Sequence, residues 1–342
     1  MRAREHGITI GQLPTGARNS ITDIKGVRVG HATIDTERNK TGVTVVMPSA
    51  DNPYINKLVA ASFVLNGFGK TQGLIQIDEL GAIETPIALT NTLNIGLVHD
   101  ALVEYAIRTC AEEGKRVTTV NPIVCECNDA SLNDIQYRAV TQKHVFSAIE
   151  NASETVTEGD VGCGKGTTCH GLKGGVGTSS RKIELTSGTY HIGALAQTNH
   201  GRLKDLTING NAVGQEIYRH LHDNTPDKGS CIIIIATDLP VSSRQLRRII
   251  KRAGVGLARL GSFWGHGSGD IFIGFTTANR IPDGKDEILP FHVLNESLLD
   301  IAFRAAAEAT EEAVLNSMLM ASTVAGFNGN VRESLETYLH HS

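Results

Sequence analysis

Short apolar runs recur along the chain and predict buried strands. We expect strands at 27–34, 42–47, 86–90, 191–197, 231–237 and 270–276. The clearest run is Ser230-Cys-Ile-Ile-Ile-Ile-Ala-Thr, whose four consecutive isoleucines are typical of a strand buried on both faces. A polar loop at 223–229 leads directly into this strand, so an exposed segment feeds a buried one through Gly229 and Ser230.

Three longer segments have the apolar spacing or the composition of helices. In 243–260 the apolar residues recur every three or four positions, and Ser242 or Ser243 is the expected N-cap. The segment 296–321 is rich in Ala, Leu and Glu and predicts a long packed helix, and 97–113 predicts another. Strands and helices mix along the whole chain without a low-complexity linker, so we expect a single domain over residues 1–342.

Composition adds limits on partners and location. The chain has 342 residues and 40% hydrophobic content, enough for a large core. The formal net charge is -4 and no long basic run occurs, so we expect no nucleic-acid partner. The N-terminal residues lack the apolar core of a signal peptide, and no apolar run approaches the roughly 18 residues of a membrane helix. A cytoplasmic protein without membrane contact is the expectation.

The cysteine spacing gives no reason to expect a metal. Six cysteines occur, and in the cytosol such thiols usually stay reduced. Neither Cys125-x-Cys127 nor Cys163-x5-Cys169-His170 has the C-x2-C spacing common in zinc sites. We therefore expect no metal and no other cofactor.

Two glycine-rich segments fail the motifs that they approach. In 159–168, Gly159, Gly164 and Lys165 fit a phosphate-binding loop, but Gly166 stands where the Mg²⁺-binding hydroxyl belongs. The sequence around Ser268 is Gly-His-Gly-Ser-Gly-Asp, which is not the G-x-S-x-G of an α/β-hydrolase. A nucleotide-binding protein that uses 159–168 remains a lower alternative.

Gly229-Ser230 is the most informative dipeptide. A hydroxyl nucleophile needs a base, and an N-terminal serine has one in its own α-amine, whose reference pKa of about 7.7–8.0 lies near working pH. An internal serine becomes N-terminal only if the chain is cut before it, and glycine upstream tolerates the required backbone strain. Read alone, the same dipeptide also fits an ordinary turn before a strand.

Longer motifs in a fixed order distinguish these interpretations, because together they resemble the DmpA-type family of L-aminopeptidase D-amidase/D-esterases and β-aminopeptidases. The matching segments, from about residue 10 to about residue 325, are Asp23-Ile-Lys-Gly-Val-Arg-Val-Gly-His, Glu84-Thr-Pro-Ile-Ala-Leu-Thr-Asn-Thr-Leu, Leu132-Asn-Asp-Ile, Gly171-Leu-Lys-Gly-Gly-Val-Gly-Thr-Ser-Ser-Arg, Gln197-Thr-Asn-His-Gly, Gly229-Ser-Cys-Ile-Ile-Ile-Ile-Ala-Thr-Asp-Leu-Pro and Gly265-His-Gly-Ser-Gly-Asp-Ile-Phe.

The resemblance implies an α+β fold, a four-layer αββα sandwich similar to N-terminal nucleophile hydrolases but with different connectivity. It implies self-cleavage into an α chain, 1–229, and a β chain, 230–342, that stay together and assemble as a tetramer of αβ units. The implied activity is an aminopeptidase or amidase that releases N-terminal residues from small peptides, amides or esters. No metal or cofactor takes part.

The resemblance also assigns the site residues. Ser230 matches the nucleophile, and Gly229 and Ser230 flank the cut. Ser268 matches a second active-site serine, and Asp270 matches an acidic residue that orients the site. Asn199 matches the oxyanion-hole amide, a role that suits a neutral N–H donor. Glu126 lies where relatives hold the free amine of the substrate.

Departures from the family pattern concern Ser131, Lys70 and Cys231. Ser131 stands where an aromatic is frequent and Lys70 where an acid is frequent, which leaves open whether α-, β- or D-residues are preferred. Cys231 follows the nucleophile, where an aliphatic is commoner, and is a rival nucleophile if the register is shifted. An acyltransferase of the ornithine acetyltransferase type is the main alternative function on the same architecture.

Overall fold

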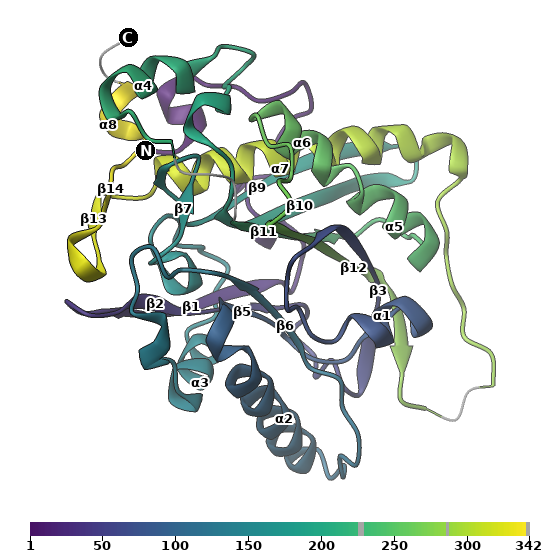
Figure 1. Cartoon of the computed structure of the whole chain (residues 1–342). Coiled ribbons are helices and arrows are strands. Elements are labelled where there is room, and N and C mark those ends of the chain that lie inside the picture. Colours follow the sequence, from purple (N-terminus) through teal and green to yellow (C-terminus); the bar gives the residue numbers. More distant parts are fainter. Residues whose placement is uncertain (225–228, 285–286, 340–342) are drawn as a thin grey trace.

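Two β-sheets packed face to face form the centre of the molecule, and helices cover both outer faces (Figure 1). The computed structural model describes residues 1–224, 229–284 and 287–339. The smaller sheet has the order β1-β2-β5-β6 and the larger sheet the order β4-β3-β12-β11-β10-β9. This arrangement confirms the α+β, four-layer αββα sandwich.

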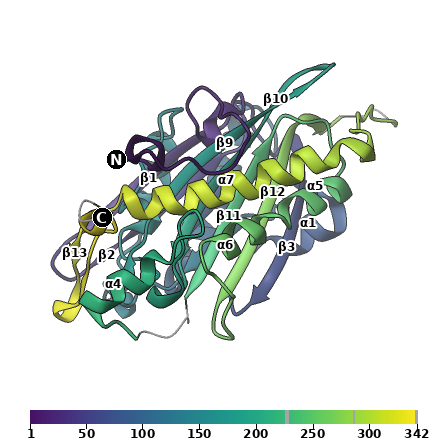
Figure 2. The ribbon, with the colours of Figure 1, turned by 90° about the horizontal axis from the view of Figure 1, so that it is seen from above.

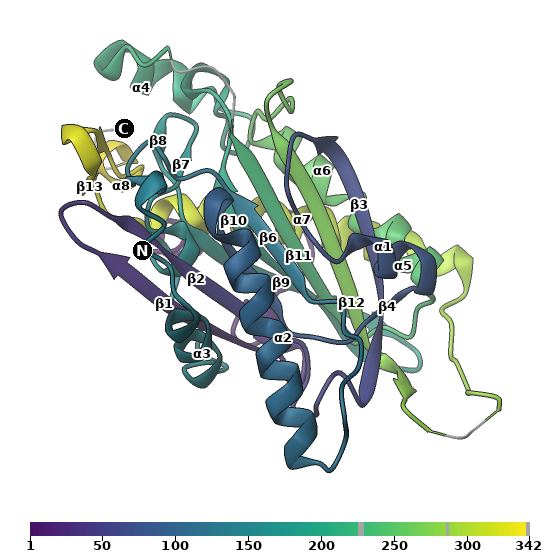
Figure 3. The ribbon, with the colours of Figure 1, turned by 60° about the horizontal axis from the view of Figure 1, so that its bottom comes forward.

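The smaller sheet consists of β1 (Arg28–Asp35), β2 (Lys40–Met47), β5 (Ile87–Asn91) and β6 (Ile123–Cys127). Neighbouring strands are antiparallel except for β5 and β6, which are parallel. Helices α2 (Ile95–Glu112) and α3 (Gln142–Glu150) cover its outer face (Figure 3). Val98 and Val145 of these helices belong to one hydrophobic cluster with Val43 and Val45 of β2.

The larger sheet consists of β3 (Asn56–Gly67), β4 (Ala82–Ile83), β9 (Val176–Leu185), β10 (Gly188–Asn199), β11 (Ser230–Thr237) and β12 (Gly269–Pro282). Only β11 and β12 are parallel neighbours. Its outer face is covered by α5 (Ser243–Ile250), α6 (Ala253–Arg259) and the long α7 (Leu299–Leu319), which Figure 2 shows from above. The remaining short elements are α1 (Leu74–Leu80), α4 (Val213–Leu221), α8 (Glu336–Leu339), β7 (Thr168–Cys169), β8 (Leu172–Lys173), β13 (Val324–Ala325) and β14 (Val331–Arg332).

The isoleucine run allows β11 to contribute side chains to two hydrophobic cores. Side chains alternate across a strand, so successive isoleucines point to opposite faces. Ile232 and Ile234 lie in the core between the sheets, while Ile233 and Ile235 lie in the core under the helices. All eight residues of β11 are buried, as the sequence predicts for a strand covered on both faces.

The six predicted strands are confirmed as β1, β2, β5, β10, β11 and β12, and two of the three predicted helices as α2 and α7. The third helix, 243–260, is wrong as one element, because the chain turns at 251–252 and continues as α6. Gly256 lets α6 approach α7 closely, since a Cβ there would lie 2.5 Å from the carbonyl oxygen of Ala307. Ser242 is the N-cap of α5, and its hydroxyl accepts the Gln245 N–H. Of the polar loop predicted at 223–229, residues 225–228 lie outside the described residues.

Candidate active site

Ser230 and Asn199 face each other at one end of the larger sheet. Ser230 is the first residue of β11, Asn199 is the last residue of β10, and the two are register partners in the antiparallel pair. Directly opposite residues project to the same face of a sheet. Since Ile232 points into the core between the sheets, Ser230 and Asn199 point to that side as well. Both are 5% exposed.

The side-chain amide of Asn199 is held at its oxygen. The backbone N–H of Thr168, in β7, donates to Asn199 Oδ1 over 2.9 Å. Because the amide group is planar, this contact leaves Nδ2 on the side away from Thr168. Asn199 thus has a fixed orientation and an N–H donor to offer, which suits an oxyanion-hole amide.

Gly229 is held so closely that no other residue fits there. A Cβ at this position would lie 1.6 Å from the carbonyl oxygen of Asn199. The carbonyl of Gly229 accepts a hydrogen bond from the backbone N–H of Gly269 over 3.2 Å. This N–H already polarises the carbonyl that Ser230 would attack.

Ser230 is also fixed from the smaller sheet. The thiol of Cys127, in β6, donates to the Ser230 carbonyl over 3.4 Å. Burial raises the pKa of Cys127 well above its ordinary value, so the thiol stays protonated and serves as a donor. Residue types alone gave no signal for this role, since it depends on the packing of one sheet on the other.

Ser268 lies in a tightly held loop before β12. Its carbonyl accepts hydrogen bonds from Asn66 Nδ2 over 2.5 Å and from the Phe68 N–H over 3.2 Å. Its hydroxyl is fully buried and has no hydrogen-bond partner among the residues that the structure describes. A buried polar group without a partner calls for a functional or structural explanation.

Asp270 lies on the other face of the sheet from the Ser230 hydroxyl. It is the register partner of Cys231, one residue beyond Ser230, and it is fully buried. Ile271 and Ile273 point into the core between the sheets, so alternation directs Asp270 toward the helix-covered face. Any influence on Ser230 must therefore come from behind the strand.

The close approach of two glycines, Gly69 and Gly269, places Glu126 near the start of β12. Its Oε1 accepts the Lys70 N–H over 3.1 Å, and its Oε2 accepts the Thr92 hydroxyl. A Cβ at Gly269 would lie 2.8 Å from the Cα of Gly69, and one at Gly69 would lie 3.9 Å from Glu126 Oε1. Gly269 is the register partner of Ser230, so only the backbone at Gly69 lies between that residue and the Glu126 carboxylate. Glu126 is 2% exposed.

The structure shows where the three residues that depart from the family pattern lie. The Cys231 side chain lies in the helix-side core with Ile233, on the face opposite Ser230, which favours Ser230 as the nucleophile. Lys70 approaches Glu126 with its backbone, while its ammonium lies 4.6 Å from the Phe68 ring centre. The Ser131 carbonyl accepts the side-chain amide of Asn330 over 3.0 Å.

The segment 159–168 is packed as a structural turn. Lys165 Nζ lies 2.8 Å from a carboxylate oxygen of Asp35 and 2.8 Å from one of Asp160. A Cβ at Gly166 would lie 2.0 Å from the Lys40 carbonyl oxygen. The segment contains a single 3-10 turn, Gly162–Gly164, and leads into β7, whereas a phosphate loop opens a helix.

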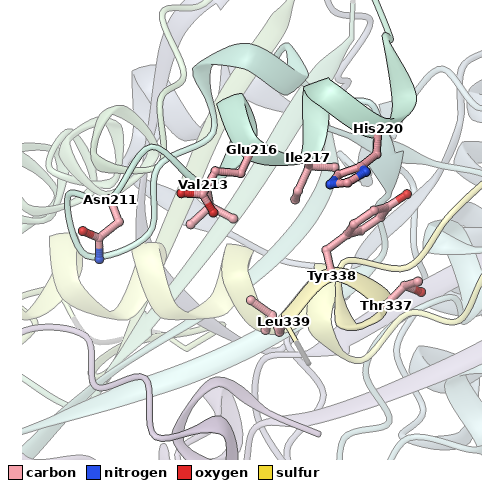
Figure 4. A pocket seen from close by; sticks show the side chains of 8 residues that line it. All are labelled: Asn211, Val213, Glu216, Ile217, His220, Thr337, Tyr338 and Leu339. Carbon is pink, nitrogen blue, oxygen red and sulfur yellow. The ribbon is translucent and has the colours of Figure 1, made fainter. Parts of the chain in front are cut away.

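A cavity of about 620 Å³ lies elsewhere, between α4 and α8 (Figure 4). In the figure, Ile217 and His220 of α4 face Tyr338 of α8. Its lining residues are Asn211, Val213, Glu216, Ile217, His220, Thr337, Tyr338 and Leu339. None of them belongs to the predicted site, so cavity size does not locate the chemistry.

The family model described as "Peptidase family S58" matches residues 19–332. The chain belongs to peptidase family S58. The match confirms the resemblance to the DmpA-type family, and the chain is therefore an enzyme, a hydrolase of the aminopeptidase/amidase kind. Among the described residues of this peptidase, no helix combines the length and apolarity needed to cross a bilayer.

Relatives of the peptidase cover nearly its whole length. The β-peptidyl aminopeptidase BapA of Sphingosinicella xenopeptidilytica is 36% identical, over 96% of this chain and 87% of its own. The PH0078 protein of Pyrococcus horikoshii OT3 is 46% identical with a TM-score of 0.93, over 99% of this chain and 98% of its own. The L-aminopeptidase D-Ala-esterase/amidase of Ochrobactrum anthropi, a variant of the Ntn hydrolase fold, is 36% identical with a TM-score of 0.91, over 98% and 95%.

Proposed function

We propose that the peptidase cuts its own chain between Gly229 and Ser230 and then uses Ser230 to release N-terminal residues from peptides or amides. One observation carries the proposal. Ser230 opens a buried strand directly opposite Asn199, while the carbonyl on its upstream side accepts the N–H of Gly269.

Self-cleavage follows from this arrangement as an N→O acyl shift. The Ser230 oxygen bonds to the Gly229 carbonyl carbon, the C–N bond breaks, and the hydroxyl proton passes to the departing nitrogen. The Gly269 N–H supports the negative charge that develops on the Gly229 oxygen. Water then hydrolyses the ester, which leaves the Gly229 carboxylate and frees both the hydroxyl and the α-amine of Ser230.

The freed α-amine is the base for turnover. It takes the proton as Ser230 Oγ attacks the substrate carbonyl, and Nδ2 of Asn199 donates to the oxyanion. The leaving amine departs with a proton, and water resolves the acyl-enzyme. The unpartnered hydroxyl of Ser268 supports a role as a hydrogen-bond partner of the new N-terminus. Asp270 lies on the helix-covered face of the sheet, and from that face it positions Ser268 and the α-amine of Ser230.

Glu126 is the proposed anchor of the substrate's free amine. Its carboxylate accepts the Lys70 N–H and the Thr92 hydroxyl, and these two contacts hold it in place for an ion pair with an ammonium group. The name of the Sphingosinicella relative supports N-terminal β-residues as substrates, and that of the Ochrobactrum relative supports α-residues. We propose β-residues as the preferred class. p-Nitroanilides of β-homoalanine and L-alanine compare the two, and faster release from the L-alanine compound contradicts the preference.

Both fragments are proposed to remain in one domain, and four such units to form a tetramer. Residues 287–294 run apart from the sheets (Figure 1) and expose Ile288 by 87% and Val293 by 59%, which supports self-association. All six cysteines are buried and none is joined to another in a disulfide, which supports a reducing, cytoplasmic location.

A denaturing gel with N-terminal sequencing tests the central step. Wild-type protein should give two bands, 1–229 and 230–342, and the smaller should begin Ser-Cys-Ile-Ile. Ser230→Ala should give one uncut, inactive chain. Cys231→Ser is the matched control and should still be cut before Ser230. One intact band from active wild-type protein contradicts the proposal, and a fragment that begins at Cys231 moves the nucleophile by one residue.

A further inference from the structure

Three metal-binding side chains converge next to Asn199, although the sequence spacing of the cysteines did not predict a metal site. Cys169 ends β7, His170 follows it, and His200 follows Asn199 at the end of β10. Their ligand atoms all lie within 4.8 Å of one another, and all three residues are buried. Cys169 Sγ lies 4.0 Å from His200 Nδ1, and the two imidazole rings are 5.5 Å apart.

The backbone fixes the tautomer of His170. Its Nδ1 lies 3.1 Å from the carbonyl oxygen of Arg202. A carbonyl can only accept, so Nδ1 carries the hydrogen and Nε2 keeps its lone pair. Metal-binding imidazoles commonly donate their other N–H to a backbone carbonyl in this way. Gly201 makes room for the ring, since a Cβ there would lie 2.5 Å from it.

His200 is buried and has a ring nitrogen available for a metal. It is 3% exposed, and its Nε2 has no hydrogen-bond partner within the described parts of the chain.

We propose that Cys169, His170 and His200 bind a zinc ion. One thiolate and two imidazoles suit Zn²⁺ in donor type, and three protein ligands leave a fourth position for water. With Zn–S of about 2.3 Å and Zn–N of about 2.0–2.1 Å, tetrahedral ligand atoms lie roughly 3.3–3.6 Å apart. The three groups must therefore close by about an ångström, a rotamer-scale adjustment, to reach coordination distance.

The site would act on catalysis only by positioning. Thr168 holds the Asn199 amide, and Cys169 and His200 are the residues directly after these two. A zinc ion between them fixes the spacing of β7 and β10 and hence the direction of the Asn199 amide. All three ligands precede Gly229, so zinc would stay on one fragment whether or not the chain is cut.

Zinc binding is measured directly on the full chain, with any affinity tag removed. After dialysis against a chelator, calorimetric titration with ZnCl₂ and elemental analysis should give one zinc per chain. Titration with CoCl₂ should produce a thiolate-to-cobalt charge-transfer band, which requires a cysteine ligand. No uptake, or uptake of cobalt without that band, overturns the proposal.

Variants locate the site. Cys169→Ser and His170→Gln should weaken zinc binding by at least roughly 10–100-fold. Cys163→Ser is the matched control, because Cys163 is equally buried in the same glycine-rich region but lies outside the cluster. It should retain one zinc. Wild-type affinity in Cys169→Ser, or equal loss in Cys163→Ser, overturns the assignment. If Cys169→Ser does not fold, the cobalt band of the wild type decides.

Discussion

Asn199 acquires its proposed role from its neighbours rather than from its residue type. The oxygen of its amide is held by Thr168, and its backbone carbonyl lies where a side chain at position 229 would have to go. Strand pairing puts it opposite Ser230. A single residue is therefore positioned by two separate segments, β7 and residues 229–230, and its amide N–H is directed before any substrate arrives.

Replacement of Asn199 by alanine should leave the fold intact and remove one oxyanion donor. We expect kcat to fall by about 10²–10³. Steady-state kinetics measure the loss, and a circular dichroism spectrum checks the fold. Asn211→Ala, at an exposed position, is the control and should keep wild-type kcat. Near wild-type turnover in Asn199→Ala would remove this residue from the mechanism.

Replacement of Glu126 by glutamine keeps the shape and removes the charge. If the carboxylate pairs with the substrate ammonium equally in the ground and transition states, KM should rise more than kcat falls. The same pairing predicts that amino-acid p-nitroanilides are cleaved and that their N-acetyl forms are not. Comparable rates on free and acetylated substrates would contradict the anchor.

At the scale of elements, the sequence predicts an element best where one residue type dominates the segment. The four isoleucines of β11 specify a two-faced buried strand without reference to the rest of the chain. The strand β9 was missed because Thr178, Ser179, Ser180 and Arg181 look like a polar loop. They are buried by particular partners: Arg181 pairs with Glu308 and Glu312 of α7, far away in sequence.

The site residues show the same contrast between what the sequence predicts and what depends on distant partners. The sequence, through its resemblance, named Ser230 and Asn199, and strand register puts them on one face. It did not reveal that Asp270 points to the other face, because the face of a strand residue depends on register. Cys169 and His200 are 31 positions apart, so their proximity depends on the pairing of distant segments.

The close contact of α6 with α7 gives a prediction at this scale. In Gly256→Ala the new Cβ would meet the Ala307 oxygen at 2.5 Å and the Glu311 nitrogen at 2.7 Å, both backbone atoms of α7. The helices must move apart, and we expect a loss of about 1–3 kcal/mol in the free energy of unfolding. Urea unfolding in the uncut Ser230→Ala background measures it.

Gly96→Ala is the matched control for that experiment. Gly96 lies in α2, and a Cβ there meets no atom within 4 Å. Alanine should leave stability unchanged or raise it by up to about 1 kcal/mol. Equal effects from the two substitutions would show that the α6–α7 contact is not tight.

At the scale of the whole molecule, the proposed cut passes through the middle of the larger sheet. β11 would begin the second fragment, yet it pairs with β10 of the first on one side and β12 of its own on the other. Separation would expose apolar strand faces on both fragments, at roughly 25 cal/mol per Å² of apolar surface. We expect the fragments to elute as one particle in size-exclusion chromatography and to separate only on a denaturing gel.

Light scattering on the same column run gives the mass of that particle. A tetramer of αβ units is the expected value, and polar substitutions at Ile288 and Val293 should shift it toward single units. An unchanged mass in both variants would exclude residues 287–294 from the contact between units.

The position of β11 between β10 and β12 also means that the proposed cut would make refolding difficult to repeat. In an uncut chain, β11 and β12 pair with the strands on either side of them as parts of one polypeptide, at a rate independent of protein concentration. After the cut, a denatured molecule must reassemble from two separate polypeptides, one of which begins with a bare apolar strand. The proposed processing would thus turn a unimolecular folding reaction into a bimolecular one, and the fragments would regain the active state only in competition with aggregation.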